Sequence, residues 1–304
     1  MGILIGIFVN NLLPVFLIIG VGVLIGVLVK PNVRSISRTT FYALTPCAIF
    51  ASLTGAELTG AETGQVALFA AIATLATAAL AWPVATLLGW RGVRRRAALL
   101  SVLVINSGNF GVSVCLFAFG AEGKARAMVY FVTTAAIASS LGVVLAAGGG
   151  SWRKAINNLV RIPMLYALVA AIPVMLFPQT LRVPAVLMRP IDLLGDAAVP
   201  MMLLTLGLQL AESVRGLHNH IGPILFAAAF RLLVAPLVAL PVARLTGVQG
   251  VTFQTAMVEA STPTGVTAAI LALEYELEPE AVTGAIFFST LLSGLTLSVL
   301  IGIL

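Results

Sequence analysis

The sequence predicts an all-α membrane protein with ten transmembrane helices, arranged as two inverted five-helix repeats with crossed discontinuous helices 4 and 9. Of its 304 residues, 60% are hydrophobic and only 9% are charged, whereas soluble domains carry about 25% charged residues. The alternating pattern of a transmembrane β-barrel is absent, so the spans are helices. Two of the apolar stretches contain polar, helix-breaking segments, which predicts the discontinuous pair.

Apolar stretches of roughly 20 residues divide the chain into ten helices. The first stretch ends at Lys30-Pro31-Asn32, the basic loop RGVRRR follows the third, and GGGSWRKAINN connects the fifth to the sixth. No basic segment precedes the first stretch, so we expect it to be retained as a span and not removed as a signal peptide. The expected helices are 3–29, 36–57, 64–89, 97–120, 125–147, 160–178, 186–212, 220–245, 250–275 and 279–304.

The basic residues predict the orientation in the membrane. The first, third, fifth and seventh loops carry ten Lys and Arg residues, Arg215 in the seventh among them, and the second, fourth, sixth and eighth carry five. Cytoplasmic loops are the more basic ones, so we expect both termini outside a cell membrane. The ninth loop, EYELEPEA, is acidic, but acidic residues count little in this rule. The net charge of +6 is explained by these loops and indicates no nucleic-acid partner.

The two halves of the chain are expected to be repeats of opposite orientation. We divide the chain into a first repeat (1–147), a cytoplasmic connection (148–159) and a second repeat (160–304), and an odd number of helices in each repeat inverts the second. At an offset of 154 residues, LTPCAIFASL resembles AVPMMLLTLG, and NSGNFGVSV resembles ASTPTGVTA. Inverted repeats are the usual plan of secondary transporters.

The fourth and ninth helices contain the two polar breaks. The first break is Asn106 to Gly111, and the second is Glu259 to Gly265, where Pro263 lacks an N–H and crowds the carbonyl of Glu259. Carbonyls freed in this way suit a small cation, and the N-termini of the resumed half-helices suit an anion. The alternative for each break is a kink that only serves helix packing.

Glu259 lies about ten residues into its span, where an ionised carboxylate costs at least about 3 kcal/mol. Two interpretations compete. In one, Glu259 forms a structural ion pair with Arg231 of the eighth helix. In the other, Glu259 binds Na⁺ or H⁺ as a coupling ion, and Arg231 is free to attract an anionic substrate.

The motifs NSGNFGV, STPTGV followed by FFSTLLSGLTLSVL, and VPMMLLTLGLQL occur in an order that resembles the auxin efflux carrier family. The resemblance covers nearly the whole chain. It implies a scaffold of helices 1, 2, 6 and 7, a transport core of helices 3–5 and 8–10, and a crossing at Asn109 and Pro263. It also implies organic-anion substrates, such as malate, malonate or an auxin-like acid. The chain departs from the plant pattern because its first break contains glycines and no proline, and because it lacks a long central loop.

A more distant resemblance is to the bile acid sodium symporters. It implies that Glu259, Ser107 and Asn109 bind Na⁺ as the coupling cation, which is the only metal or cofactor that we expect. For substrate binding we select residues of the two breaks together with one arginine: Asn106, Gly108, Asn109, Gly111, Ser261, Thr262, Pro263, Thr264 and Arg231.

The function predicted is secondary active transport of a small organic anion by alternating access, with the lipid bilayer as the surroundings. A channel or facilitator is the first alternative. An intramembrane enzyme is the second, but the spans contain no histidine beyond His220 at the first residue of the eighth, no lysine, and no aspartate beyond Asp192 and Asp196, so we expect no catalytic residue. Oligomeric state is left open; carriers of this plan often form a homodimer through their scaffold helices.

Overall fold

The computed structural model describes residues 2–56, 58–177, 179–212 and 220–304. Within these residues the chain is helical throughout, apart from loops and one isolated β-bridge. Six helices are long and apolar enough to cross a membrane, and a seventh span results if the bent pair 152–159 and 163–176 counts as one. An all-helical, multi-pass membrane protein is therefore confirmed, while the ten-helix arrangement stays a prediction.

The first half of the chain consists of long segments in which π-helical turns join the α-helices. They are α1 (Gly2–Ile7), η1 (Phe8–Leu12), α2 (Leu13–Leu28), α3 (Val33–Thr39), η2 (Thr40–Leu44), α4 (Thr45–Gly55), α5 (Gly60–Leu87), α6 (Gly92–Leu103), η3 (Ser107–Gly111), α7 (Val112–Ile137), η4 (Ala138–Gly142) and α8 (Val143–Ala147).

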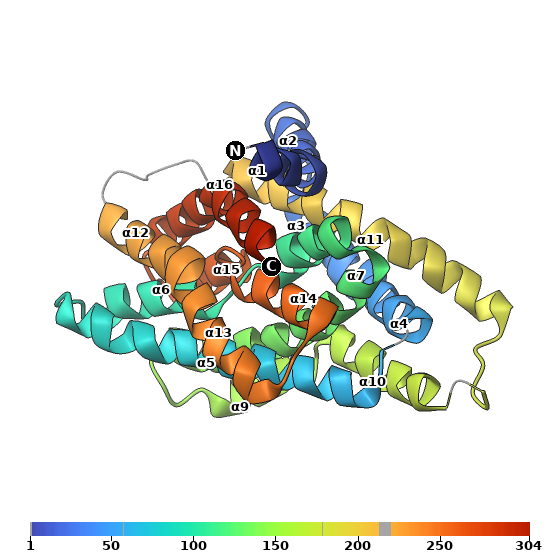
Figure 1. Cartoon of the computed structure of the whole chain (residues 1–304). Coiled ribbons are helices and arrows are strands. Elements are labelled where there is room, and N and C mark those ends of the chain that lie inside the picture. The colour runs from blue at the N-terminus through green and yellow to red at the C-terminus, as the bar shows by residue number, and fades with distance from the viewer. Residues whose placement is uncertain (1, 57, 178, 213–219) are drawn as a thin grey trace.

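The second half of the chain is also built of helices (Figure 1). Its elements are α9 (Trp152–Leu159), α10 (Pro163–Leu176), α11 (Ala185–Glu212), α12 (Ile221–Ala229), η6 (Phe230–Val234), α13 (Ala235–Thr246), α14 (Gly250–Ala260), α15 (Thr267–Glu274) and α16 (Pro279–Ile303). Each of the ten expected ranges contains helix. Several start earlier than expected; α5, for example, begins at Gly60 because Thr59 and Glu62 form a capping box there.

One apolar segment is too long for a single crossing. Helical structure runs from Ser107 to Ala147, 41 residues, which at 1.5 Å per residue would be about 60 Å, twice the ~30 Å hydrocarbon core of a bilayer. Gly120, with φ 66° and ψ −155°, is not helical and divides the segment into two helices. This agrees with the expected end of the fourth helix at residue 120.

Left-handed backbone turns recur at a constant spacing in the two halves. Gly89 and Gly247, Gly92 and Gly250, and Gly120 and Glu278 all have positive φ, and the members of each pair are 158 residues apart. The sequence similarity suggested 154 residues instead. The difference of four residues is about one helical turn, so a match at either offset aligns similar helix faces.

Contacts between loops fall into two groups that do not mix. Odd-numbered loops meet through Lys154 and Glu274 (2.6 Å), Arg96 and the carbonyl of Ala146 (2.7 Å), and His220 and Glu278 (3.4 Å). Segments at even-numbered loops and the C-terminus meet through Glu62 and Arg126 (3.2 Å), Arg126 and Thr252 (2.7 Å), and Gln254 and Leu304 (3.2 Å). This is the pattern expected if every intervening segment crosses from one face to the other. Arg215, counted in the orientation, lies outside the described residues.

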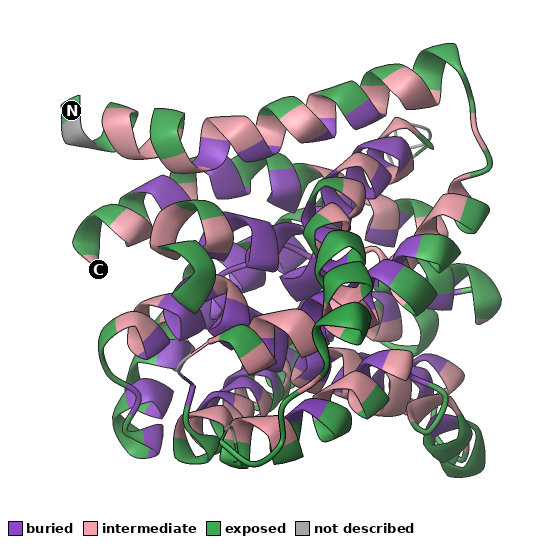
Figure 2. Ribbon diagram, turned by 90° about the vertical axis from the view of Figure 1, so that its right-hand side faces the viewer, coloured by how far each residue is buried: buried purple, intermediate pink, exposed green. Residues whose placement is uncertain are grey.

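Helices α2 and α11 pack side by side at glycines (Figure 1). A Cβ built on Gly207 would lie 2.8 Å from the Cα of Gly22 and would overlap the carbonyl oxygen of Ile19. Small residues allow such close approach between helices in membranes. The opposite face of α2 carries exposed Leu17 and Leu24, and exposed residues cover the outside of the molecule in general (Figure 2). Among these exposed side chains are many large apolar ones, as expected of a surface in contact with lipid.

We expect Gly207→Val to lower the melting temperature of the detergent-solubilised protein by several degrees. The added side chain meets backbone atoms that have no room to retreat, and overpacking costs about 1–3 kcal/mol. Thermal unfolding followed by size-exclusion chromatography measures the effect. Gly20→Val is the matched control, since a Cβ there would meet nothing within 4 Å; equal melting temperatures for the two variants would contradict this account of the contact.

Candidate functional site

The two breaks predicted from the sequence lie against each other. Helix α6 ends at Leu103 and helical structure resumes at Ser107, while α14 ends at Ala260 and α15 begins at Thr267. The N–H of Asn106 donates to the carbonyl of Pro263, and the N–H of Gly265 donates to the carbonyl of Val104, both at 2.8 Å. These reciprocal bonds form an antiparallel bridge, in which each break satisfies one N–H and one carbonyl group of the other.

Side chains hold this crossing in place. The hydroxyl of Thr264 donates to the carbonyl of Ser101 at 2.8 Å, and its N–H donates to the hydroxyl of Ser289 at 3.1 Å. A Cβ on Gly265 would lie 2.5 Å from the carbonyl oxygen of Ile105. Glycine is therefore required at position 265 by the close approach of the two backbones.

The carbonyls freed at the end of α14 are bound by Arg231. Its Nη2 donates to the carbonyls of Ala260 (2.7 Å) and Thr262 (2.8 Å), and its Nε donates to Thr262 again (3.0 Å). Arg231 lies on η6 and only 1% of it is exposed. These carbonyls therefore face a guanidinium group, not the small cation that the sequence suggested for them.

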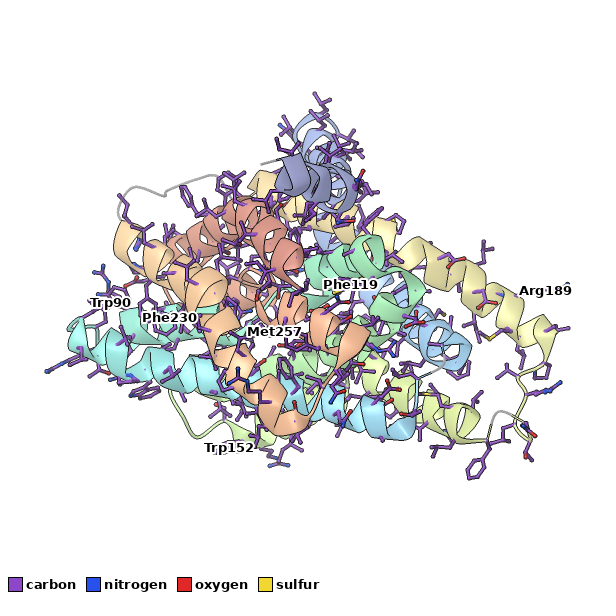
Figure 3. The ribbon with its side chains drawn as sticks, in the orientation of Figure 1. Trp90, Phe119, Trp152, Arg189, Phe230 and Met257 are labelled. Carbon is purple, nitrogen blue, oxygen red and sulfur yellow. The ribbon has the colours of Figure 1, made fainter. Side chains whose placement is uncertain are left out.

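Glu259 is completely buried, with 0% exposure. It lies in the last turn of α14, two residues after Met257, which Figure 3 labels near the middle of the molecule. Its carboxylate packs on the Cα of Gly111, where a Cβ would overlap it. Among the described residues Glu259 Oε2 and Ser107 Oγ have no hydrogen-bond partner, and no Glu259–Arg231 pair occurs within 4.0 Å. The structural ion pair considered for these two residues is therefore not formed.

A cavity of about 1060 Å³ reaches the crossing. Its inner end is lined by Ile105, Asn106 and Gly108 from the first break and by Gly265 and Val266 from the second. Its rim is formed by residues 31–34 around the start of α3, by residues 279–280 at the start of α16 and by the end of α11. The walls come from α3, η2, α11, α15 and α16.

Hydrogen-bond donors converge at the inner end of the cavity. Asn106 is 3% exposed, and its Nδ2 has no hydrogen-bond partner within the described part of the chain. The bonds of the two resumed helices begin at Phe110 N–H and Ala268 N–H, so the amide groups before them have no carbonyl one turn back. Two helix N-termini with a free amide donor suit an anion.

The sequence-selected residues separate into two groups. Asn106, Gly108 and Asn109 line the cavity. Asn109 lies in η3, past the crossing, because the helix has already resumed at Ser107; the first-break residues at the crossing are Val104, Ile105 and Asn106. The others lie behind the cavity wall: Ser107, Gly111, Arg231, Glu259, Ser261, Thr262, Pro263 and Thr264.

The hydroxyls of the second break are engaged locally. Ser261 donates to the carbonyl of Met257 (2.7 Å) and Thr262 donates to that of Glu259 (2.7 Å). With Thr264 bound to Ser101, none of these three hydroxyls lies among the cavity-lining groups of the described residues. Their predicted role in binding the substrate directly has no geometric support in this conformation.

Sequence reasoning missed the wall that α11 contributes. Met202, Thr205 and Gln209 line the cavity, and Gln209 Nε2 donates to the hydroxyl of Ser37 at 3.3 Å. Their spacing of three and four residues places them on one helix face. Two polar residues on one face of the apolar stretch AVPMMLLTLGLQL are the signal that would have found this wall.

Comparison with known proteins finds relatives among membrane transporters. Residues 143–301 match the family model described as membrane transport protein. The chain is 28% identical over 271 residues to an uncharacterized transporter of Methanothermobacter thermautotrophicus, covering 88% of both chains. It is 30% identical over 142 residues to auxin efflux carrier component 1 of Arabidopsis thaliana, covering 47% of this chain and 22% of the plant protein.

The family match covers more than half of the chain, so the protein belongs to the membrane transport protein family. Its relatives include auxin efflux carriers of Arabidopsis thaliana and Oryza sativa, which confirms the resemblance that the sequence motifs indicated. A second archaeal relative, from Methanocaldococcus jannaschii, is also named an uncharacterized transporter and is 27% identical over 203 residues, 66% of this chain and 65% of the relative.

We expect Gly265→Ala to destabilise the protein by about 1–3 kcal/mol, as overpacking against fixed backbone does. The added methyl group would meet the carbonyl of Ile105, whose neighbours are held by the two crossing hydrogen bonds. Thermal unfolding in detergent measures this. Gly64→Ala on α5 is the control, because a Cβ there would meet nothing within 4 Å. An unchanged melting temperature for Gly265→Ala would show that the crossing tolerates separation.

Proposed function

We propose that this protein is a secondary carrier of a small organic anion that works by alternating access in the cell membrane, with Na⁺ or H⁺ as the coupling ion. The observation that carries the proposal is the inner end of the cavity, where two helix N-termini and the unpartnered Nδ2 of Asn106 converge. The substrate class is a carboxylate such as malate, malonate or an auxin-like acid, in keeping with the plant relatives named auxin efflux carriers. The protein is proposed to have no enzymatic activity.

The proposed topology is ten crossings in two inverted five-helix repeats, with both termini outside. Three pairs of left-handed turns at a spacing of 158 residues support the repeat. The separate contacts of odd-numbered and even-numbered loops support the parity of the crossings. The crossed pair is then α6–α7 with α14–α15. The transport core comprises helices 3–5 and 8–10 of the sequence numbering, and the scaffold comprises helices 1, 2, 6 and 7.

The cavity has the position that alternating access requires. Its rim gathers residues from the first, seventh and ninth loop regions, which the charge rule assigns to the cytoplasm. Its walls combine elements of the proposed scaffold (α3, η2, α11) with elements of the proposed core (α15, α16). This conformation therefore represents a state open to the cytoplasm, and relative movement of scaffold and core would open the anion site to the other face.

The coupling ion is proposed to bind at Glu259. A buried carboxylate whose Oε2 lacks a partner among the described residues is costly unless a cation or proton neutralises it. Ser107 Oγ also lacks a partner among the described residues and is the candidate for a second ligand. Asn109 was also selected as a ligand of the coupling cation, on the resemblance to sodium symporters. Because it lines the cavity, we propose it primarily as a ligand of the substrate.

We expect Asn106→Leu to reduce uptake of the transported anion about tenfold or more. The substitution keeps the volume and removes a hydrogen bond to a charged group, which is worth about 1.5–3 kcal/mol. Uptake of radiolabelled malonate, malate and indole-3-acetate into proteoliposomes, preloaded with the same acid, measures it. Saturable, exchange-stimulated uptake by the native protein distinguishes a carrier from a channel. No uptake of any organic anion would contradict the proposed function.

The control for this variant is Asn157→Leu on α9, an exposed asparagine far from the crossing in sequence and outside the residues that line this cavity. It is expected to transport at the native rate. If both variants lost uptake equally at equal melting temperature, Asn106 would be excluded as a ligand of the substrate.

Glu259→Gln is expected to abolish the dependence of uptake on a Na⁺ or H⁺ gradient while the protein remains folded. The amide is neutral and nearly isosteric, so it removes the charge without leaving a void. Uptake is compared with inward Na⁺, inward H⁺ and no gradient, and melting temperature reports folding. A variant that still responds to the gradient as the native protein does would exclude Glu259 as the coupling site.

A further inference from the structure

Arg231 is a buried charge whose partners are uncharged. It is 1% exposed, and its hydrogen bonds to the described residues all go to backbone carbonyls, those of Ala260 and Thr262. Carbonyls at the end of a helix carry a partial negative charge of about half an electron. They stabilise the guanidinium but do not cancel it.

Glu259 provides the opposite charge nearby without contacting Arg231. It directly precedes Ala260, whose carbonyl accepts from Arg231 Nη2. The other titratable side chains beside this centre are Tyr130 and Cys115 on α7, a phenol and a thiol, and Cys115 Sγ lies 4.0 Å from Glu259 Oε1. Arg126 and Glu62 lie at the far end of α14, near Thr252, and are paired with each other. Within the described residues, the centre of the molecule therefore holds one arginine and one carboxyl group, Arg231 and Glu259.

One short segment of the second break connects Arg231 to the inner end of the cavity. Arg231 binds the carbonyl of Thr262, and the next carbonyl, that of Pro263, accepts from the N–H of Asn106. Asn106 lines the inner end of the cavity. Among the described lining residues the only arginines, Arg34 and Arg38, come from the rim side and are accompanied by Glu212 and Glu280. No lysine or arginine of the described lining lies at the inner end.

We propose that Arg231 is the fixed positive charge of the anion site, and that Glu259 cancels this charge until the coupling cation binds. With Glu259 ionised, the buried centre is neutral and attracts an anion weakly. When a cation neutralises Glu259, the centre becomes singly positive, and binding of one carboxylate restores neutrality. Cation and anion therefore bind as a pair because of charge balance in a medium of low dielectric constant. This inference rests on the proposed carrier function.

The experiment measures anion affinity in four purified variants. The probe is whichever of malonate, malate or indole-3-acetate gives the greatest exchange in proteoliposomes. The dissociation constant of this anion is determined by calorimetry in detergent. Each protein is measured with Na⁺ and with choline, both at about 100 mM, and at acidic and alkaline pH. The variants are Glu259→Gln, Arg231→Met, Arg231→Lys and the double variant Arg231→Met/Glu259→Gln. Arg244→Met, an exposed arginine on α13, is the matched control.

The native protein is expected to bind the anion about tenfold more tightly with its coupling cation than without, a difference of about 1.4 kcal/mol. Glu259→Gln should bind as tightly without cation as the native protein does with it. Arg231→Met and the double variant should bind the anion at least tenfold more weakly than the native protein does with its cation. Arg231→Met should still respond to the cation because Glu259 remains, whereas the double variant should not. Arg231→Lys should keep most of the affinity because it keeps the charge, and Arg244→Met should behave as the native protein does.

Two results would overturn the inference. The first is a double variant that binds as tightly as Glu259→Gln, which would show that the charge of Arg231 is irrelevant. The second is a Glu259→Gln variant with no gain of affinity in the absence of cation, which decides the question even if Arg231→Met does not fold. Failure of the carrier function is seen separately, as absence of anion exchange by the native protein.

Discussion

The pair of backbone hydrogen bonds between residues 104–106 and 263–265 is the constraint on which the rest of this structure depends. A helix interrupted within the bilayer leaves N–H and C=O groups that no water can satisfy. Here each interruption satisfies the other, so neither break is stable without its counterpart. The small residue at Gly265, the hydroxyl of Thr264 and the guanidinium of Arg231 all follow from this need.

At the crossing, the C-terminal and N-terminal ends of the broken helices have different surroundings. On the C-terminal side of α14 the carbonyls are covered by Arg231, which seals them in the protein interior. On the N-terminal side of η3 and α15 the first amide groups lie beside a cavity. A site that hides its acceptors and presents its donors discriminates against cations and favours anions, before any particular side chain is considered. Backbone direction determines which helix ends meet here, and Arg231 covers the carbonyl end.

Much of this arrangement could be predicted from the sequence, because the determining signals are local. Hydropathy located the helical ranges, and Pro263 with the asparagine-glycine cluster at Asn106 located the breaks. What could not be predicted was pairing in space. An arginine in one span and a glutamate in the next suggested an ion pair between Arg231 and Glu259, yet the nearer carbonyls of Ala260 and Thr262 take the guanidinium.

The register of the crossing was also beyond sequence reasoning. Asn109 was aligned with Pro263, but the residues opposite Pro263 and Thr264 are Asn106 and Ile105, since helix resumes as early as Ser107. The wall provided by Thr205 and Gln209 depends on which face α11 turns inward, and mean apolarity does not reveal that face. Cavities depend on packing between distant segments, which composition does not specify.

Arg126 lies outside the set of residues that line the cavity. Its guanidinium joins three helices at once, through Glu62 at the start of α5, Glu122 on its own segment and Thr252 on α14. These contacts oppose sliding among the three helices and favour their movement as one unit. Any large rearrangement of the chain would then bend at the loops that leave this group of helices.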